Sequence, residues 1–214
     1  MKKYESVIFD LDGTLTDSGE GITKSVVYAF EKLHLKPPVQ KDLDLFIGPP
    51  LSETFPRFGV PAEQTDEAIR YFRDRYLTVG KFENKPYEGI EDLLSSLKEN
   101  GQKLYVATSK MEVTAIEILR HFNLDTYFDE IAGATEGHER ETKDAVIAYL
   151  LRKIHADHCV MVGDTAYDVN GASRLHIPCI GVAWGYGSTQ EMKDAGAIGI
   201  VDTMNDLKKA LSEE

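Results

Sequence analysis

Short apolar runs recur along the chain at intervals that indicate a parallel β-sheet. The first, Val7-Ile8-Phe9, is continuous rather than alternating, which is typical of a strand buried on both faces. Five later runs have the same character. The six predicted strands cover residues 5–10, 103–108, 130–133, 159–163, 179–183 and 198–201.

Helical periodicity occupies the intervals between these runs. Ile90, Leu93, Leu94 and Leu97 repeat at helical spacing, and the stretch from Val146 to Ile154 does the same. Strands that alternate with helices of this length predict right-handed crossovers and a doubly wound, Rossmann-like parallel sheet, so the expected fold class is α/β. In such sheets the functional residues lie at the carboxyl ends of the strands.

One long interval breaks the alternation. From residue 15 to residue 82 the pattern is helical only, with prolines and glycines such as Pro37-Pro38 and Gly48-Pro49-Pro50 dividing it into several helices. No strand is expected there. We interpret residues 15–82 as an all-helical cap domain inserted into an α/β core made of residues 1–14 and 83–214.

Composition and charge exclude some partners. The 214 residues suit one core with a sizeable insertion, and the net charge of −12 repels a nucleic-acid backbone with no Lys/Arg cluster to offset it. No apolar stretch approaches the length of a membrane span, and the first apolar run is too short for a signal sequence. We therefore expect a cytoplasmic protein without nucleic-acid or membrane partners. The oligomeric state stays open between monomer and homodimer.

The first predicted strand ends in Asp10-Leu11-Asp12-Gly13-Thr14. Residues two apart in an extended segment project to the same side, so both carboxylates can face one site, and Gly13 permits a tight turn. Paired acids beside a glycine suit cation binding and nucleophilic attack. The alternative is an ordinary turn at the end of a strand.

Three further stretches carry groups that suit phosphate chemistry. Thr108 and Ser109 follow a predicted strand, where hydroxyl and backbone N–H groups can bind phosphate or simply cap a helix. Lys143 lies near the start of a predicted helix and can hold an anion, although a solvated lysine is the simpler alternative. Asp164 and Asp168 follow the strongest apolar strand; they suit a magnesium site, or a helix cap and a solvated acid.

In this order the motifs resemble those of the haloacid dehalogenase superfamily, and the resemblance covers the whole chain. It implies that Asp10 is a nucleophile and Asp12 a general acid and base. It further implies that Thr108 and Lys143 bind phosphate, and that Mg²⁺ is held by Asp10, the backbone carbonyl of Asp12, Asp164 and Asp168. An acid two residues after the nucleophile points to phosphate esters rather than carbon–halogen bonds.

Within the superfamily, residues 46–51 and 182–188 look like the phosphoglycolate phosphatase-like subgroup. This implies a phosphatase for a small phosphate monoester, with Gly48 and Pro49 in a substrate-selecting loop. Lys24, Arg57 and Lys81 are cap cations that either contact substrate or are solvated. The alternatives are a 5′-nucleotidase acting on nucleoside monophosphates and a β-phosphoglucomutase-like phosphomutase. A phospho-receiver signalling domain is disfavoured, because the expected middle strand ends in Thr108-Ser109 rather than in an aspartate.

Overall fold

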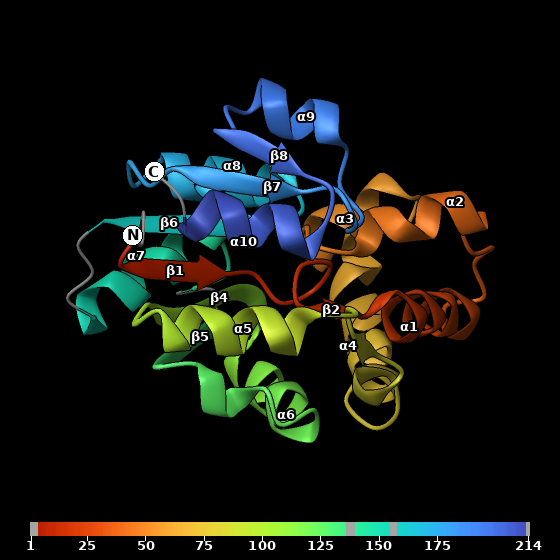
Figure 1. The fold of residues 1–214 in the computed structure, drawn as a ribbon. Helices are drawn as coiled ribbons and strands as arrows, with labels where there is room; N and C mark the ends of the chain where they lie inside the picture. The colour runs from red at the N-terminus through yellow and green to blue at the C-terminus, as the bar shows by residue number, and fades with distance from the viewer. Residues whose placement is uncertain (1–3, 136–139, 155–157, 213–214) are drawn as a thin grey trace. The chain divides into compact units, whose positions relative to one another are not determined.

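The computed structural model describes residues 4–135, 140–154 and 158–212 (Figure 1). The chain divides into two compact units. One comprises Met1–Thr16 together with Pro86–Glu214, and the other comprises Asp17–Lys85. Each unit has a core of its own. Among the described residues, no helix combines the length and the apolar character needed to cross a bilayer.

The larger unit is built on a six-stranded sheet in the order β5-β4-β1-β6-β7-β8, in which each neighbouring pair is parallel. The predicted doubly wound α/β core is confirmed. The strands are β1 (Ser6–Phe9), β4 (Lys103–Met111), β5 (Glu130–Ala134), β6 (Cys159–Gly163), β7 (Cys179–Val182) and β8 (Gly199–Val201).

Alternate residues of β1 face opposite sides of this sheet, which gives two apolar cores. Val7 and Phe9 lie in one core with side chains of α5, α6 and α10, whereas Ile8 lies in the other with side chains of α7, α8 and α9. Helices therefore cover both faces, as the continuous apolar strands require. These helices are α5 (Ile90–Glu99), α6 (Glu112–His121), α7 (Lys143–Lys153), α8 (Ala166–Ser173), α9 (Thr189–Asp194) and α10 (Met204–Ser212), with the short 3₁₀ helix η4 (Asp125–Tyr127).

The strand register brings the predicted motifs to one edge of the sheet. Phe9 pairs with Val106 on one side and with Val162 on the other, so the residues that follow these three positions leave the sheet together. Strand β4 runs beyond residue 108, where we expected it to end. Its pairing with β5 is irregular between Ala107 and Met111, and the N-cap of α6 is Met111 rather than Thr108 or Ser109.

The smaller unit is mainly helical. Its core contains the mutually packed rings of Phe30, Phe46 and Phe55. The helices are α1 (Gly19–Lys32), α2 (Gln40–Leu43), α3 (Leu51–Arg57) and α4 (Thr65–Tyr76), with 3₁₀ helices η1 (Asp44–Phe46), η2 (Ala62–Gln64) and η3 (Gly80–Phe82).

The expectation of no strand within residues 15–82 was wrong. A two-residue strand, β2 (Thr16–Asp17), pairs with β3 (Lys85–Pro86) in a separate two-stranded sheet. These strands form at the two points where the chain passes from one unit to the other. A strand of two residues has no apolar periodicity, so the pattern of side chains could not reveal it.

Candidate active site

The loop after β1 holds two buried aspartates, Asp10 and Asp12. Gly13 makes the turn that follows them, with a φ of 81° in the left-handed region that favours glycine. Its N–H donates to the carbonyl of Thr16 at 2.8 Å. The Thr14 carbonyl accepts a hydrogen bond from the Trp184 indole at 3.2 Å, which ties this loop to the segment after β7.

Three carboxylates converge at the carboxyl ends of β1 and β6. Oxygen atoms of Asp10, Asp164 and Asp168 lie within 4.8 Å of one another, and all three residues are buried. Asp164 accepts hydrogen bonds from the Thr14 hydroxyl at 3.1 Å and from the Tyr186 N–H at 2.9 Å. Its orientation is therefore fixed from two loops.

Asp168 has a second, structural task at the start of α8. One of its oxygens, Oδ2, accepts from the Thr165 N–H at 3.0 Å, and the Asp168 N–H points back to the Thr165 side chain, which together form a capping box. The same oxygen also accepts from the Thr165 hydroxyl at 2.8 Å. The N-cap of α8 is thus Thr165, and the alternative that Asp164 caps this helix was wrong. The alternative of a solvated Asp168 was also wrong, because Asp168 is fully buried.

Lys143 is the first residue of α7 and is buried. Its Nζ lies 2.7 Å from Asp10 Oδ1 and 2.8 Å from Asp168 Oδ1, and it donates to the carbonyl of Ala107 at 3.1 Å. Burial lowers the pKa of Lys143, but the charges of Asp10 and Asp168 outweigh this effect and raise it overall. The lysine is therefore a charged member of the cluster, and the solvated alternative was wrong.

The acidic groups exceed the basic groups that face them. Burial raises the pKa of Asp10 to about 7, with Lys143 opposing and Asp168 adding to the increase. Burial, followed by repulsion from Asp168 and Asp10, also raises the pKa of Asp164. When Asp12 and Lys110 are included, the described residues place four buried carboxylates and two ammonium groups here, which leaves two negative charges when all are ionised. An oxygen-lined site with this deficit fits a hard divalent cation.

Asp12 stands apart from the group of three carboxylates. Its Oδ2 lies 3.0 Å from the Nζ of Lys110, a residue for which the sequence pattern indicated no role. A lysine two positions after Thr108 has no pattern that separates it from a surface lysine. Whether the backbone carbonyl of Asp12 binds metal stays a prediction.

Thr108 and Ser109 follow Ala107 in β4, the strand beside β1. Thr108 is buried and Ser109 is partly exposed. The Thr108 hydroxyl accepts a hydrogen bond from the Lys110 N–H at 3.2 Å, and this bond fixes the local backbone. The predicted contacts of Thr108 and Ser109 with phosphate stay predictions.

The predicted cap residues lie in the smaller unit. Gly48 and Pro49 connect η1 to α3 and are half-buried, and Arg57 is the last residue of α3. Lys81 lies in η3, with its Nζ 5.1 Å from the centre of the Phe82 ring. Their predicted substrate contacts are not tested by these positions.

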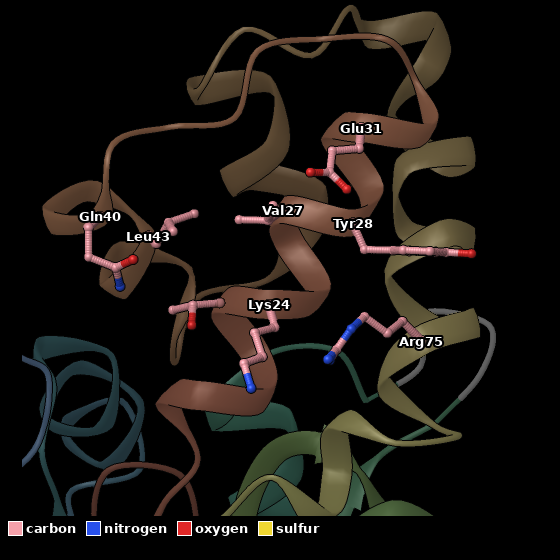
Figure 2. A pocket seen from close by; sticks show the side chains of 8 residues that line it. Lys24, Val27, Tyr28, Glu31, Gln40, Leu43 and Arg75 are labelled. Carbon is pink, nitrogen blue, oxygen red and sulfur yellow. The ribbon is translucent and has the colours of Figure 1, made fainter.

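Lys24 borders an open hollow of about 280 Å³ in the same unit (Figure 2). Lys24 pairs with Glu20 and Glu83, and Arg75 donates to both oxygens of Glu83 and to the Ser25 hydroxyl. The positive charges at this hollow are therefore compensated inside the unit. Its lining is contributed by α1, α2 and α4: Thr23, Lys24, Val27, Tyr28, Glu31, Gln40, Leu43 and Arg75.

The fold and the site together define a Rossmann-like α/β protein. At the carboxyl edge of its sheet lies a group of buried carboxylates that could hold a cation. The family model described as haloacid dehalogenase-like hydrolase matches residues 7–182. The chain belongs to this family, as the motifs indicated.

Individual relatives span nearly the whole chain. A 5′-nucleotidase of Pseudomonas aeruginosa is 43% identical over 194 residues, covering 89% of this chain and 88% of that protein. Tyrosine-protein kinase PtkA of Mycobacterium tuberculosis is 40% identical over 211 residues, covering 96% of this chain and 72% of that protein. The crystal structure of a predicted phosphatase from Clostridium acetobutylicum superimposes with a TM-score of 0.92 at 46% identity, covering 97% of each chain.

Proposed function

We propose that this chain is a Mg²⁺-dependent phosphatase that hydrolyses a small phosphate monoester through an aspartyl-phosphate on Asp10. The observation that carries the proposal is the buried Asp10 carboxylate, ion-paired with Lys143 inside a cluster in which carboxylates outnumber ammonium groups. Such a carboxylate has an oxygen fixed for attack and a nearby place for a cation. Family membership and the similarity to proteins named as phosphatases support the proposal.

Two displacements account for the reaction. In the first, a carboxylate oxygen of Asp10 forms a bond to phosphorus while the ester P–O bond breaks, and Asp12 gives a proton to the departing alkoxide. In the second, Asp12 takes a proton from water, whose oxygen attacks phosphorus and displaces Asp10. A positioned acid and base of this kind typically accelerates such steps about 10²–10⁴-fold.

The remaining residues bind and orient. Lys143 holds Asp10 in place, and its charge reduces the repulsion between that carboxylate and the incoming phosphate. We assign Thr108 and Ser109 to hydrogen bonds with the phosphate oxygens. Asp10, Asp164 and Asp168, with the Asp12 carbonyl, would hold Mg²⁺, which supplies positive charge against the oxygens of the transferred group.

The candidate substrates differ in the alcohol that leaves when the phosphate ester is cleaved. The cap-loop and C-terminal motifs favour a phosphoglycolate-like ester, whereas the 43% identical relative named 5′-nucleotidase favours nucleoside 5′-monophosphates. We assign the choice between them to residues of the Asp17–Lys85 unit, including Gly48 and Pro49. The chemistry itself lies in the other unit, so both substrate classes are compatible with the same catalytic residues.

A phosphate-release screen tests the proposal. Purified protein is incubated with phosphoglycolate, nucleoside 5′-monophosphates, glucose phosphates and 4-nitrophenyl phosphate, with Mg²⁺ or with EDTA. We expect release of inorganic phosphate that EDTA abolishes and excess Mg²⁺ restores. No release from any ester, or release unaffected by EDTA, would contradict the proposal. Isomerisation of a glucose phosphate without phosphate release would identify a phosphomutase, and labelling of tyrosine from ATP would identify a kinase.

Gly13→Ala should weaken metal binding at this site. A Cβ at Gly13 would lie 2.1 Å from Asp164 Oδ2, and the φ of 81° adds backbone strain. Because displaced groups around a metal ligand typically cost about 10–100-fold in affinity, we expect a loss of that size in Mg²⁺ titration calorimetry. Gly101→Ala is the matched control, since Gly101 has a φ of 76° and, apart from its own chain neighbours, no atom of the described part of the chain lies within 4 Å of its Cβ position. Equal affinities of the two variants would contradict the contact.

A further inference from the structure

Lys110 and Asp12 form an ion pair that is almost closed to solvent. The Nζ of Lys110 lies 3.0 Å from Asp12 Oδ2, and the two side chains are 8% and 10% exposed. By comparison, Lys98 and Asp129 in the same unit are also 3.0 Å apart, but their side chains are 36% and 31% exposed. A pair withdrawn from water constrains its members far more than a surface pair does.

The backbone of β4 is irregular in the segment that contains Lys110. Ala107 pairs with Ala132 of β5 and Met111 pairs with Ala134, so β4 advances four residues while β5 advances two. Residues 108–110 lie opposite the single residue Gly133, so two residues of β4 are extra and the strand is irregular here. Bulges of this kind redirect side chains beside functional sites. The hydrogen bond from the Lys110 N–H to the Thr108 hydroxyl stabilises this conformation.

The two oxygens of Asp12 consequently differ. Oδ2 is held by Lys110, whereas Oδ1 is buried and has no hydrogen-bond partner within residues 4–135, 140–154 and 158–212. A buried polar atom without a partner is uncommon and calls for a functional explanation. An acid and base needs one oxygen that is not already engaged in an intramolecular hydrogen bond and a side chain that keeps a single orientation.

We propose that Lys110 is the positioning residue of Asp12: it anchors Oδ2, so that Oδ1 is the atom that gives the proton to the leaving oxygen and later takes one from water. This inference rests on the proposed phosphatase function and adds to it a residue and an atom. The proton moves from Oδ1 to the ester oxygen as the P–O bond breaks, and it is replaced from water as Asp10 is released.

The test compares leaving groups. For Lys110→Met we expect kcat to fall about 10²-fold on an alkyl phosphate, which is the size of loss expected when a general acid is misplaced. On 4-nitrophenyl phosphate we expect kcat to fall by less than about tenfold. A nitrophenolate departs without a proton, so a poorly placed Asp12 matters little for that ester. Lys98→Met is the matched control and should retain wild-type kcat on both esters. Circular dichroism checks that the variant folds. If Lys110→Met does not fold, Lys110→Gln, which keeps a polar end group, is measured in its place.

A double-mutant cycle distinguishes positioning from other roles. If Lys110 acts through Asp12, its replacement in an Asp12→Asn background should lower alkyl-ester turnover by less than about threefold, since residues that act as a unit are not additive. Equal losses on both esters with a raised KM would show direct phosphate binding and overturn the inference. A full additional loss in the double variant would also overturn it. If the wild type itself releases no phosphate, the proposed function fails instead.

Discussion

Asp10→Asn is expected to eliminate phosphatase turnover. An amide is a poor nucleophile, and the substitution also removes one of the three converging carboxylates that fit a cation. Loss of a covalent nucleophile costs up to about 10⁶-fold in well-studied hydrolases, so we expect a loss above about 10⁴-fold on every ester. Steady-state phosphate release measures the rate, and mass spectrometry of acid-quenched wild-type enzyme should show a phosphorylated Asp10 that the variant lacks.

A matched control for Asp10→Asn is Asp129→Asn. Asp129 also pairs with a lysine, Lys98 at 3.0 Å, but it lies outside the cluster. The control should keep turnover within about threefold of wild type, because Asp129 has no contact with the proposed catalytic residues and should not couple to them. An Asp10→Asn protein that retained substantial turnover would remove Asp10 from the nucleophile role.

Asp12→Asn should separate proton transfer from metal binding. The side chain of Asp12 lies outside the group of three carboxylates, so Mg²⁺ affinity should stay within about tenfold of wild type, less than the cost of losing a ligand. Turnover of an alkyl phosphate should fall about 10²–10⁴-fold because the leaving alkoxide receives no proton. Turnover of 4-nitrophenyl phosphate should fall much less. A kinetic series over leaving groups of graded pKa, with calorimetry of Mg²⁺, measures both effects.

Two results would contradict this role for Asp12. One is an equal loss on good and poor leaving groups. The other is a loss of Mg²⁺ binding as large as that of Asp164→Ala, which would make the Asp12 side chain a ligand. The variant should also have a lower melting temperature, because the buried Lys110 ammonium then has no carboxylate at 3.0 Å.

The sheet and much of its functional edge were predictable from local signals. Val7-Ile8-Phe9 showed a doubly buried strand, and residues that follow parallel strands must meet at one edge. The structure indeed brings together Asp10, Lys143, Asp164 and Asp168. Their chemical roles remain proposals, but their proximity follows from strand order alone.

Other features depend on partners that a linear pattern does not contain. The continuation of β4 to Met111 and the position of Lys110 follow from its irregular pairing with β5, not from any run of apolar residues. The choice of Thr165 over Asp164 as N-cap depends on Asp168 reaching back to it. Both residue types are good caps, so composition could not decide between them.

The position of β1 in the sheet has a consequence for biosynthesis. Its partners, β4 and β6, begin about 100 and about 150 residues later in the chain. At roughly 5–20 residues per second, a ribosome needs several seconds to complete the first partner and longer for the second. During that delay the Asp17–Lys85 unit is synthesised, while the apolar Val7-Ile8-Phe9 segment has neither neighbouring strand to pair with. The nascent chain therefore presents an unpaired apolar segment for several seconds, which is a natural target for chaperones that bind emerging polypeptides.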